Sequence, residues 1–179
     1  MRYFLRYCFL AGLIACATAT QAQQQKKLSW NDQFIIDKSG KAFPVQESFA
    51  TLNGKTYDFA NSKRPAFVYI CSESCLPCKF ELPLYLEACD ERKDVDFVYF
   101  TTQEDSVAVL EKFGDKAGKP NLYIIARPYS WFYDNQLFLG FPTKYFINSK
   151  RKVETVQLGG YMVKEKVLGE WLPVLTRLQ

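Results

Sequence analysis

Apolar positions recur along this chain with two periods, and each period predicts one kind of element. The continuous apolar run at residues 66–71 predicts a strand buried on both faces, and residues 95–101 and 121–126 predict two further strands. Residues 143–147 and 152–158 alternate apolar with polar side chains and are joined by a short polar turn. This pattern predicts an antiparallel hairpin late in the chain.

Helical periodicity is found in three segments, at residues 75–88, 104–113 and 164–178. In the first of them, Leu82, Leu86 and Cys89 recur at helical spacing. A proline removes a backbone donor and crowds the preceding turn, so we expect Pro83 to bend the first helix and Pro173 to interrupt the last.

Weaker signals precede the first long strand. Residues 49–59 alternate around Asn53-Gly54, a pair that favours a type I′ turn, and predict a β-hairpin. Residues 30–45 mix short apolar runs with Ser39-Gly40, which predicts irregular structure or short strands. The aromatic segment at residues 130–139 fits no element. Aromatic side chains are more often buried than exposed, so most rings of this region are expected in the core, namely those of Tyr129, Trp131, Phe132, Tyr133 and Phe141.

The order of these elements defines a fold class. A strand–helix–strand portion followed by a hairpin and a closing helix predicts an α/β domain with a mixed central β-sheet and helices on both faces. We expect this domain to occupy residues 49–179, preceded by an N-terminal extension at residues 23–48.

Residues 1–22 are typical of an export signal. Arg2 and Arg6 supply the positive region, and a short apolar run with small residues follows. Cleavage after Ala22 would release a soluble mature chain. Leu13-Ile14-Ala15-Cys16 also resembles a lipobox, in which case Cys16 would carry a lipid anchor. Both endings predict a periplasmic or otherwise extracytoplasmic protein, and the second predicts one tethered to a membrane.

Charge and composition exclude several functions. The chain holds 23 Lys and Arg against 19 Asp and Glu. Once Arg2 and Arg6 are removed with the signal, the excess of positive charge is too small to indicate nucleic-acid binding. The chain has no histidine. This excludes a metal site with histidine ligands and a Ser-His-Asp triad.

Cys75 and Cys78 form a C-x-x-C pair at the predicted helix start. A helix N-terminus favours a thiolate over a thiol, so the pKa of Cys75 should fall below the free value of about 8.5. Glu73 and Glu81 would raise that pKa by like-charge repulsion, and the sequence does not decide which effect is larger. A disulfide that closes two residues is a poor structural staple, so the pair predicts redox chemistry without a further cofactor.

Two other cysteines remain after removal of the signal. Cys71 completes a C-x3-C-x2-C spacing that holds an iron–sulfur cluster in radical enzymes, but those enzymes need a much larger barrel. The C-x3-C part also resembles that of copper-delivery proteins, which use a histidine that this chain lacks. We expect Cys71 to be a small buried residue, with an alternative disulfide to Cys75 as a second use. Cys89 lies about 20 Å along the helix from Cys75 and is expected in the core.

Several further motifs resemble the thioredoxin fold, and within it the TlpA/ResA-like extracytoplasmic thiol–disulfide oxidoreductases. These motifs are Gly140-Phe141-Pro142-Thr143 ahead of an apolar strand, Pro83 and Glu81 after the cysteine pair, and the Asn53-Gly54 hairpin. The resemblance covers about residues 49–178. It departs from the family at Ser74, where an aromatic residue usually stands.

The resemblance implies a role for each motif residue. Cys75 would be the attacking thiolate and Cys78 the resolving thiol. Pro142 would be a cis-proline, and the backbone of Phe141 would pair with an extended substrate. Glu81 would be a proton relay or a modulator of the cysteine pKa.

Leu76 and Pro77 lie between the two cysteines and are expected to set the potential of the pair. The resemblance also implies protein substrates that carry disulfides or thiols, and a membrane electron donor that keeps the pair reduced.

Two functions of different classes follow. The first is exported disulfide exchange, in the reducing direction. The second is a thioredoxin-fold binding protein or chaperone with a vestigial dithiol, which Ser74 and the aromatic segment favour. A peroxidase is a third, weaker hypothesis.

Overall fold

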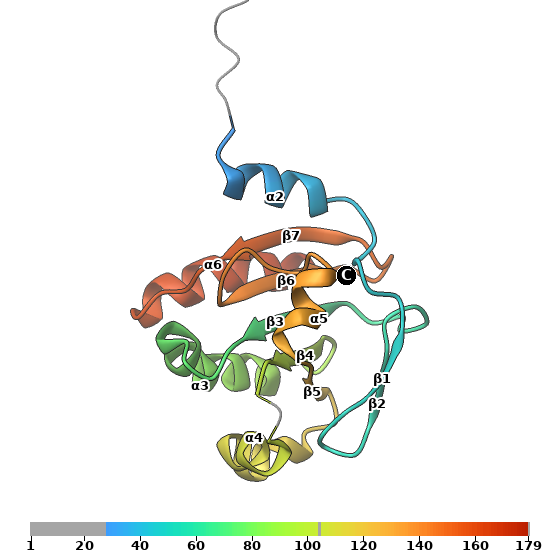
Figure 1. The fold of residues 1–179 in the computed structure, drawn as a ribbon, viewed down its shortest axis with the longest axis vertical. Coiled ribbons are helices and arrows are strands. Elements are labelled where there is room, and N and C mark those ends of the chain that lie inside the picture. The colour runs from blue at the N-terminus through green and yellow to red at the C-terminus, as the bar shows by residue number, and fades with distance from the viewer. Residues whose placement is uncertain (1–27, 104, 179) are drawn as a thin grey trace, which may run out of the picture. The chain divides into compact units, whose positions relative to one another are not determined.

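The computed structural model describes residues 28–103 and 105–178. The predicted export signal and Cys16 lie outside these residues. Within them, the main sheet holds five strands in the order β5-β4-β3-β6-β7 (Figure 1). The strands are β3 (Ala66–Cys71), β4 (Asp96–Thr101), β5 (Leu122–Ala126), β6 (Thr143–Ile147) and β7 (Val153–Leu158). All five were predicted, with ends that differ by no more than a residue.

The sheet is mixed, as predicted. β3 pairs in parallel with β4, and β4 with β5, whereas β6 runs antiparallel to both β3 and β7. Because β3 is central and β6 is antiparallel to it, the start of β6 lies beside the end of β3, where Ile70 pairs with Thr143. This register brings the segment before Thr143 close to the segment after Cys71.

Side chains of β3 alternate between two cores, one on each face of the sheet. Phe67 and Tyr69 join the core that contains α3 (Leu76–Glu91), α4 (Ser106–Phe113) and α6 (Lys164–Arg177). Val68 and Ile70 join the core that contains α5 (Tyr129–Asp134) and the hairpin of β1 (Ser48–Ala50) and β2 (Thr56–Asp58). The predicted α/β architecture with helices on both faces is therefore confirmed.

Two helices were not predicted. α2 spans Trp30–Lys38, where irregular structure was expected, and α5 spans part of the unassigned aromatic segment. No residue of α2 is fully buried, so its sequence lacks the apolar stripe by which helices are recognised. α5 is only six residues long, which is too short to display a helical period. A short 3₁₀ helix, η1, spans Gly114–Gly118.

Helices α3 and α6 both continue across their internal prolines. Pro83 and Pro173 are exposed, so the carbonyl group that loses its helical donor can bond to water instead. The predicted interruption at Pro173 is therefore wrong. No helix in the described part of the chain is both long and apolar enough to cross a membrane.

The hairpin is present, but its turn differs from the predicted type I′. Gly54 adopts a φ of 76°, whereas the described non-glycine residues with positive φ are Gln136 and Arg151. A type I′ turn would require positive φ at Asn53 as well. Instead, Thr51 and Lys55 close a longer loop, in which the Lys55 carbonyl accepts from the Thr51 backbone N–H at 2.8 Å.

Asn53 attaches this hairpin to the edge of the main sheet. Its Nδ2 donates to the carbonyl oxygens of Ala117 and Leu122 at 2.8 and 2.9 Å, and its Oδ1 accepts from the Ile124 N–H at 3.3 Å. The side chain therefore bonds to backbone groups of η1 and of β5, the edge strand of the main sheet.

This arrangement distinguishes two roles for Asn53. In a type I′ turn, Asn53→Gly would be neutral, because glycine suits that turn equally well. Since three hydrogen bonds are lost, we expect Asn53→Gly to lower the free energy of unfolding by about 2 kcal/mol. Urea denaturation measures the change, with Ser149→Gly in an exposed turn as a control. Unchanged stability would contradict the role in edge attachment.

Candidate active site

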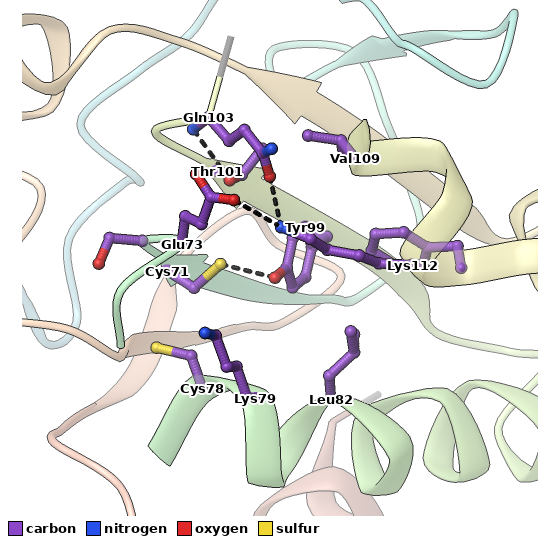
Figure 2. A pocket seen from close by; sticks show the side chains of 12 residues that line it. Cys71, Glu73, Cys78, Lys79, Leu82, Tyr99, Thr101, Gln103, Val109 and Lys112 are labelled. Carbon is purple, nitrogen blue, oxygen red and sulfur yellow. Dashed lines mark hydrogen bonds and ion pairs between the residues drawn. The ribbon is translucent and has the colours of Figure 1, made fainter. Parts of the chain in front are cut away.

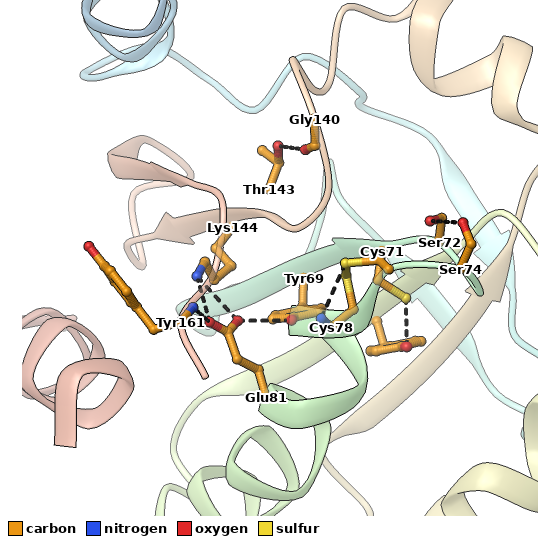
Figure 3. The surroundings of a disulfide bond; sticks show 12 residues. Tyr69, Cys71, Ser72, Ser74, Cys78, Glu81, Gly140, Thr143, Lys144 and Tyr161 are labelled. Carbon is orange, nitrogen blue, oxygen red and sulfur yellow. Dashed lines mark hydrogen bonds and ion pairs between the residues drawn. A yellow bond between two sulfur atoms is a disulfide. The ribbon is translucent and has the colours of Figure 1, made fainter. Parts of the chain in front are cut away.

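Cys75 and Cys78 form a disulfide at the N-terminus of α3 (Figure 3), with an S–S distance of 2.02 Å. Cys75 is the N-cap of the helix, and its Sγ accepts a hydrogen bond from the Cys78 backbone N–H at 3.2 Å. Pro77 lies in the first turn, where its missing N–H costs no helical bond. The end of α3 therefore places a backbone donor on the sulfur that would carry the negative charge after reduction.

The two sulfurs differ in accessibility. Cys78 is 2% exposed, whereas Cys75 is partly exposed and is followed by the exposed Leu76. A thiol or disulfide of another protein can therefore reach Cys75 before Cys78. This asymmetry matches the order of attack that the sequence resemblance implied.

The peptide bond between Phe141 and Pro142 is cis, the form that the resemblance implied for Pro142. The segment leads into β6, next to the end of β3 that continues towards Cys75. The Thr143 hydroxyl donates to the Gly140 carbonyl at 2.7 Å, and the Gly159 N–H donates to the Pro142 carbonyl at 2.8 Å. These bonds fix the loop that faces the dithiol.

The aromatic residues before Pro142 divide between core and surface. Phe132 is fully buried, as expected, but Tyr129 and Tyr133 are exposed. The Phe141 ring is partly buried and stacks on Phe138 with ring centroids 4.7 Å apart. The expectation of a core role is therefore confirmed for Phe132 and wrong for the two tyrosines.

Glu81 is fully buried and forms an ion pair that the sequence did not predict. Its Oε2 lies 3.2 Å from Nζ of Lys144, which is 1% exposed, and accepts from the Tyr69 hydroxyl at 2.9 Å. Its Oε1 accepts from the Tyr161 backbone N–H at 3.0 Å. All parts of the carboxylate are thus hydrogen-bonded, as a buried charge requires.

Opposing effects act on the titration of this network. Burial lowers the pKa of Lys144, while the neighbouring Glu81 carboxylate raises it. Burial and the same carboxylate both raise the pKa of Tyr69 far above its usual range. Tyr69 therefore remains a hydroxyl donor to Glu81 at any physiological pH.

The second carboxylate near the dithiol also has a cationic neighbour. Glu73 is exposed, and its Oε1 lies 3.5 Å from Nζ of Lys112 in α4. Ser74 lies beside it, with its hydroxyl 3.4 Å from that of Ser72. The sequence left open whether Glu73 and Glu81 outweigh the helix N-terminus, and in the structure each carboxylate is offset by a lysine.

Gly160 is packed between the dithiol helix and the cis-proline loop. A Cβ atom at this position would come within 2.7 Å of Glu81 Oε1, 2.9 Å of Pro77 Cβ and 3.0 Å of Pro142 Cγ. Only a residue without a side chain fits between these three groups. The segment after β7 therefore helps to hold both halves of the site together.

Cys71 and Cys89 are free and buried, and neither forms an alternative disulfide. The Cys71 thiol donates to the Tyr99 hydroxyl at 2.6 Å, and the Cys89 thiol to Asn121 Oδ1 at 3.4 Å. Burial raises the pKa of each thiol to about 11. Both residues are consequently poor nucleophiles at neutral pH.

Comparison with known proteins identifies the fold. No family model matches the sequence, and no curated protein matches it either. Solved structures do match. A secreted Mycobacterium tuberculosis disulfide oxidoreductase is 18% identical, with a TM-score of 0.57, and the match covers 70% of this chain and 94% of that one.

Two further structures are similar. StoA from Bacillus subtilis is 23% identical, with a TM-score of 0.54 and coverage of 72% of this chain and 98% of that one. An exposed lipoprotein thioredoxin from Streptococcus pneumoniae is 22% identical, with a TM-score of 0.56 and coverage of 75% and 100%. The chain therefore has the thioredoxin-like fold that the sequence predicted.

The buried ion pair predicts a non-additive mutational effect. Lys144→Met leaves the Glu81 charge buried without its cation, and should lower the free energy of unfolding by about 3–5 kcal/mol. Glu81→Gln should also lower the free energy of unfolding, because Lys144 is then buried without its partner. The double variant should recover most of the loss, which chemical denaturation measures as a double-mutant cycle. Additive losses would show that the pair does not act as a unit.

The raised pKa values of Cys71 and Cys89 predict a pH dependence. The oxidised protein that begins at residue 23 contains these two residues as its remaining thiols. With pKa values of about 11, both should keep their proton at pH 9.5, where a free thiol with a pKa of about 8.5 is mostly ionised. The S–H Raman band should therefore persist at pH 9.5 in folded protein and weaken strongly in guanidinium. Equal weakening in both states would contradict the effect of burial.

Proposed function

We propose that this chain is an exported thiol–disulfide oxidoreductase of the TlpA/ResA-like type, which exchanges disulfides of protein substrates through Cys75 and Cys78. The observation that carries the proposal is the asymmetric pair at the start of α3. One sulfur is accessible and accepts a backbone N–H, and the other is buried behind it. The sulfur pair itself holds the two electrons, so the reaction requires no further cofactor.

The reaction proceeds in two exchanges. The Cys75 thiolate attacks one sulfur of a substrate disulfide, forms a mixed disulfide, and releases the other substrate sulfur as a thiolate that takes up a proton. Cys78 then loses its proton and attacks the Cys75 sulfur, which releases the second substrate thiolate. The substrate disulfide gains two electrons, and Cys75 and Cys78 become a disulfide.

Glu81 is suited to assist the second exchange. It lies three residues after Cys78 in α3, a spacing that places both side chains on one side of the helix. Its carboxylate is buried and is held by Lys144 and Tyr69. We assign it the role of a positioned charge that modulates proton loss from Cys78.

The cis-proline loop is suited to bind the substrate backbone. In the described part of the chain, the N–H and C=O groups of Phe141 form no backbone hydrogen bond. An extended peptide next to Cys75 could pair with them by strand addition. Leu76 and Pro77, between the two cysteines, would tune the potential of the pair.

We further propose that the protein acts outside the cytoplasm and in the reducing direction. Support comes from the export signal in the sequence and from the fold neighbours, one of which is described as secreted and another as an exposed lipoprotein. Such a reductase needs electrons from a membrane donor. A lipid on Cys16 would hold it near that donor.

Cysteine variants test the proposed exchange. The parent protein should accelerate the reduction of insulin by dithiothreitol. The Cys75→Ser variant should not accelerate it, because the attacking thiolate is absent. Cys78→Ser should instead accumulate a mixed disulfide with its substrate, which non-reducing electrophoresis detects. Cys89→Ser serves as the matched control and should keep parental activity.

Equal activity in the parent and the Cys75→Ser variant would refute the exchange mechanism and favour a binding protein with a vestigial dithiol. The direction is tested separately, by equilibrating Cys75 and Cys78 with glutathione and trapping thiols with iodoacetamide. A midpoint near −270 mV fits a reductant, and one near −120 mV an oxidant.

A further inference from the structure

A cavity of about 310 Å³ opens beside the dithiol, between α3 and α4 (Figure 2). Its inner wall is apolar and includes Leu82, Val109 and Phe113. Cys78 and Cys71 contribute to the wall at the end nearest the disulfide. The cavity therefore borders the disulfide on the side of Cys78, and Cys75 is not among its lining residues.

The cavity continues along the same two helices as a second hollow of about 430 Å³. Both hollows are lined by Lys79, Leu82, Lys112 and Phe113, and the second extends to Leu86. Together they form one groove, called here the α3–α4 groove. From Cys78 to Leu86 the helix rises about 12 Å, a span that an extended peptide covers with about four residues.

Three lysines and two carboxylates border this groove, which leaves a small positive surplus. Lys79 projects from α3 and Lys112 from α4, and Lys116 lies farther along, whereas Glu73 and Asp115 are the acidic lining residues. Among the described residues, no carboxylate lies within ion-pair distance of Lys79 or Lys116. Lys112 crosses the mouth of the cavity, where its Nζ donates to Gln103 Oε1 at 2.5 Å and lies 3.5 Å from Glu73 Oε1 (Figure 2).

The Glu73–Lys112 contact can be exchanged easily. Both side chains are about half exposed, at 58% and 40%, and exposed ion pairs contribute little to stability. A carboxylate from another molecule can therefore replace Glu73 at small cost. Lys112 would then pair with the incoming carboxylate, and the molecule that carries this carboxylate would cover the apolar wall of the cavity.

We propose that the α3–α4 groove binds an acidic, amphipathic segment of the protein substrate, within a few residues of the substrate cysteine. Apolar side chains of the segment would cover Leu82, Val109 and Phe113, and its carboxylates would pair with Lys79 and Lys112. This inference rests on the proposed exchange function and specifies its substrate class. Charge complementarity at the groove would act on substrate choice rather than on the sulfur chemistry.

Synthetic peptides test the proposal. Each carries one cysteine, joined to a thionitrobenzoate group, and a tail of Leu-Glu-Leu-Glu, Leu-Lys-Leu-Lys or Ala-Glu-Ala-Glu on either side. Reduced protein reacts once with each peptide, and the release of thionitrobenzoate gives the second-order rate constant of that reaction. We expect the Leu-Glu tail to react at least about fivefold faster than the Leu-Lys tail at low salt, and the ratio to fall below about two in 0.5 M salt. The Ala-Glu tail should lose part of the advantage.

Charge variants locate the effect. Lys79→Glu/Lys112→Glu should invert the preference for the acidic tail, and Lys79→Gln/Lys112→Gln should abolish it. Lys150→Glu makes a similar change in the turn after β6, at the opposite end of that strand from Pro142, and should keep the parental preference. A parental protein without acidic preference, or a preference that survives in both double variants, would overturn the proposal.

A separate pair of measurements distinguishes this inference from the proposed function. Reduction of dithiobis(nitrobenzoate), which has no peptide tail, tests the dithiol alone. Fluorescence anisotropy of a labelled, cysteine-free Leu-Glu peptide with oxidised protein tests the groove alone. Loss of the first with retention of the second refutes the exchange chemistry. Retention of the first, with equal binding of the Leu-Glu peptide to the parent and to Lys79→Gln/Lys112→Gln, refutes the groove.

Discussion

A buried ion pair joins the elements on which the site depends. Glu81 belongs to the helix that carries the dithiol, and Lys144 to the strand that follows Pro142. Tyr69 from the central strand and the Tyr161 backbone complete the hydrogen bonds of the carboxylate. Because an unpaired charge in this position would be strongly unfavourable, α3, β3, β6 and the segment after β7 must keep one arrangement.

The strands were predictable from two different patterns. β3, β4 and β5 lie in largely continuous apolar runs, as strands buried on both faces do, whereas β6 and β7 alternate apolar with polar residues around a short polar turn. The dithiol helix was predictable from its spacing and from Cys75 at its start. In contrast, α2 has no buried side chain and therefore leaves no periodic signal. Asn53 misled for a different reason: its side chain bonds to strand β5, and no local pattern reveals a partner that lies about seventy residues away.

The same limit applied to the site. Cys75, Cys78 and Pro142 stand in short motifs, and Glu81 has a fixed spacing from Cys78. Lys144 has no such motif, although a lysine inside an apolar strand was itself a signal, since a buried lysine needs a carboxylate partner. Glu81 and Lys144 are brought together only by the pairing of β3 with β6 and the packing of α3 on the sheet.

The unequal burial of the two cysteines has a consequence for both directions of electron flow. By microscopic reversibility, a reaction that opens the Cys75–Cys78 disulfide passes through the same mixed disulfide as the proposed reaction that closes it. Since Cys78 is buried and Cys75 is partly exposed, the proposed exchange requires that every partner, whether it donates or accepts electrons, be linked covalently to Cys75. In that proposed reaction, substrate and reductant would compete for one sulfur, so the protein would alternate between them and would not form a covalent link to both at once.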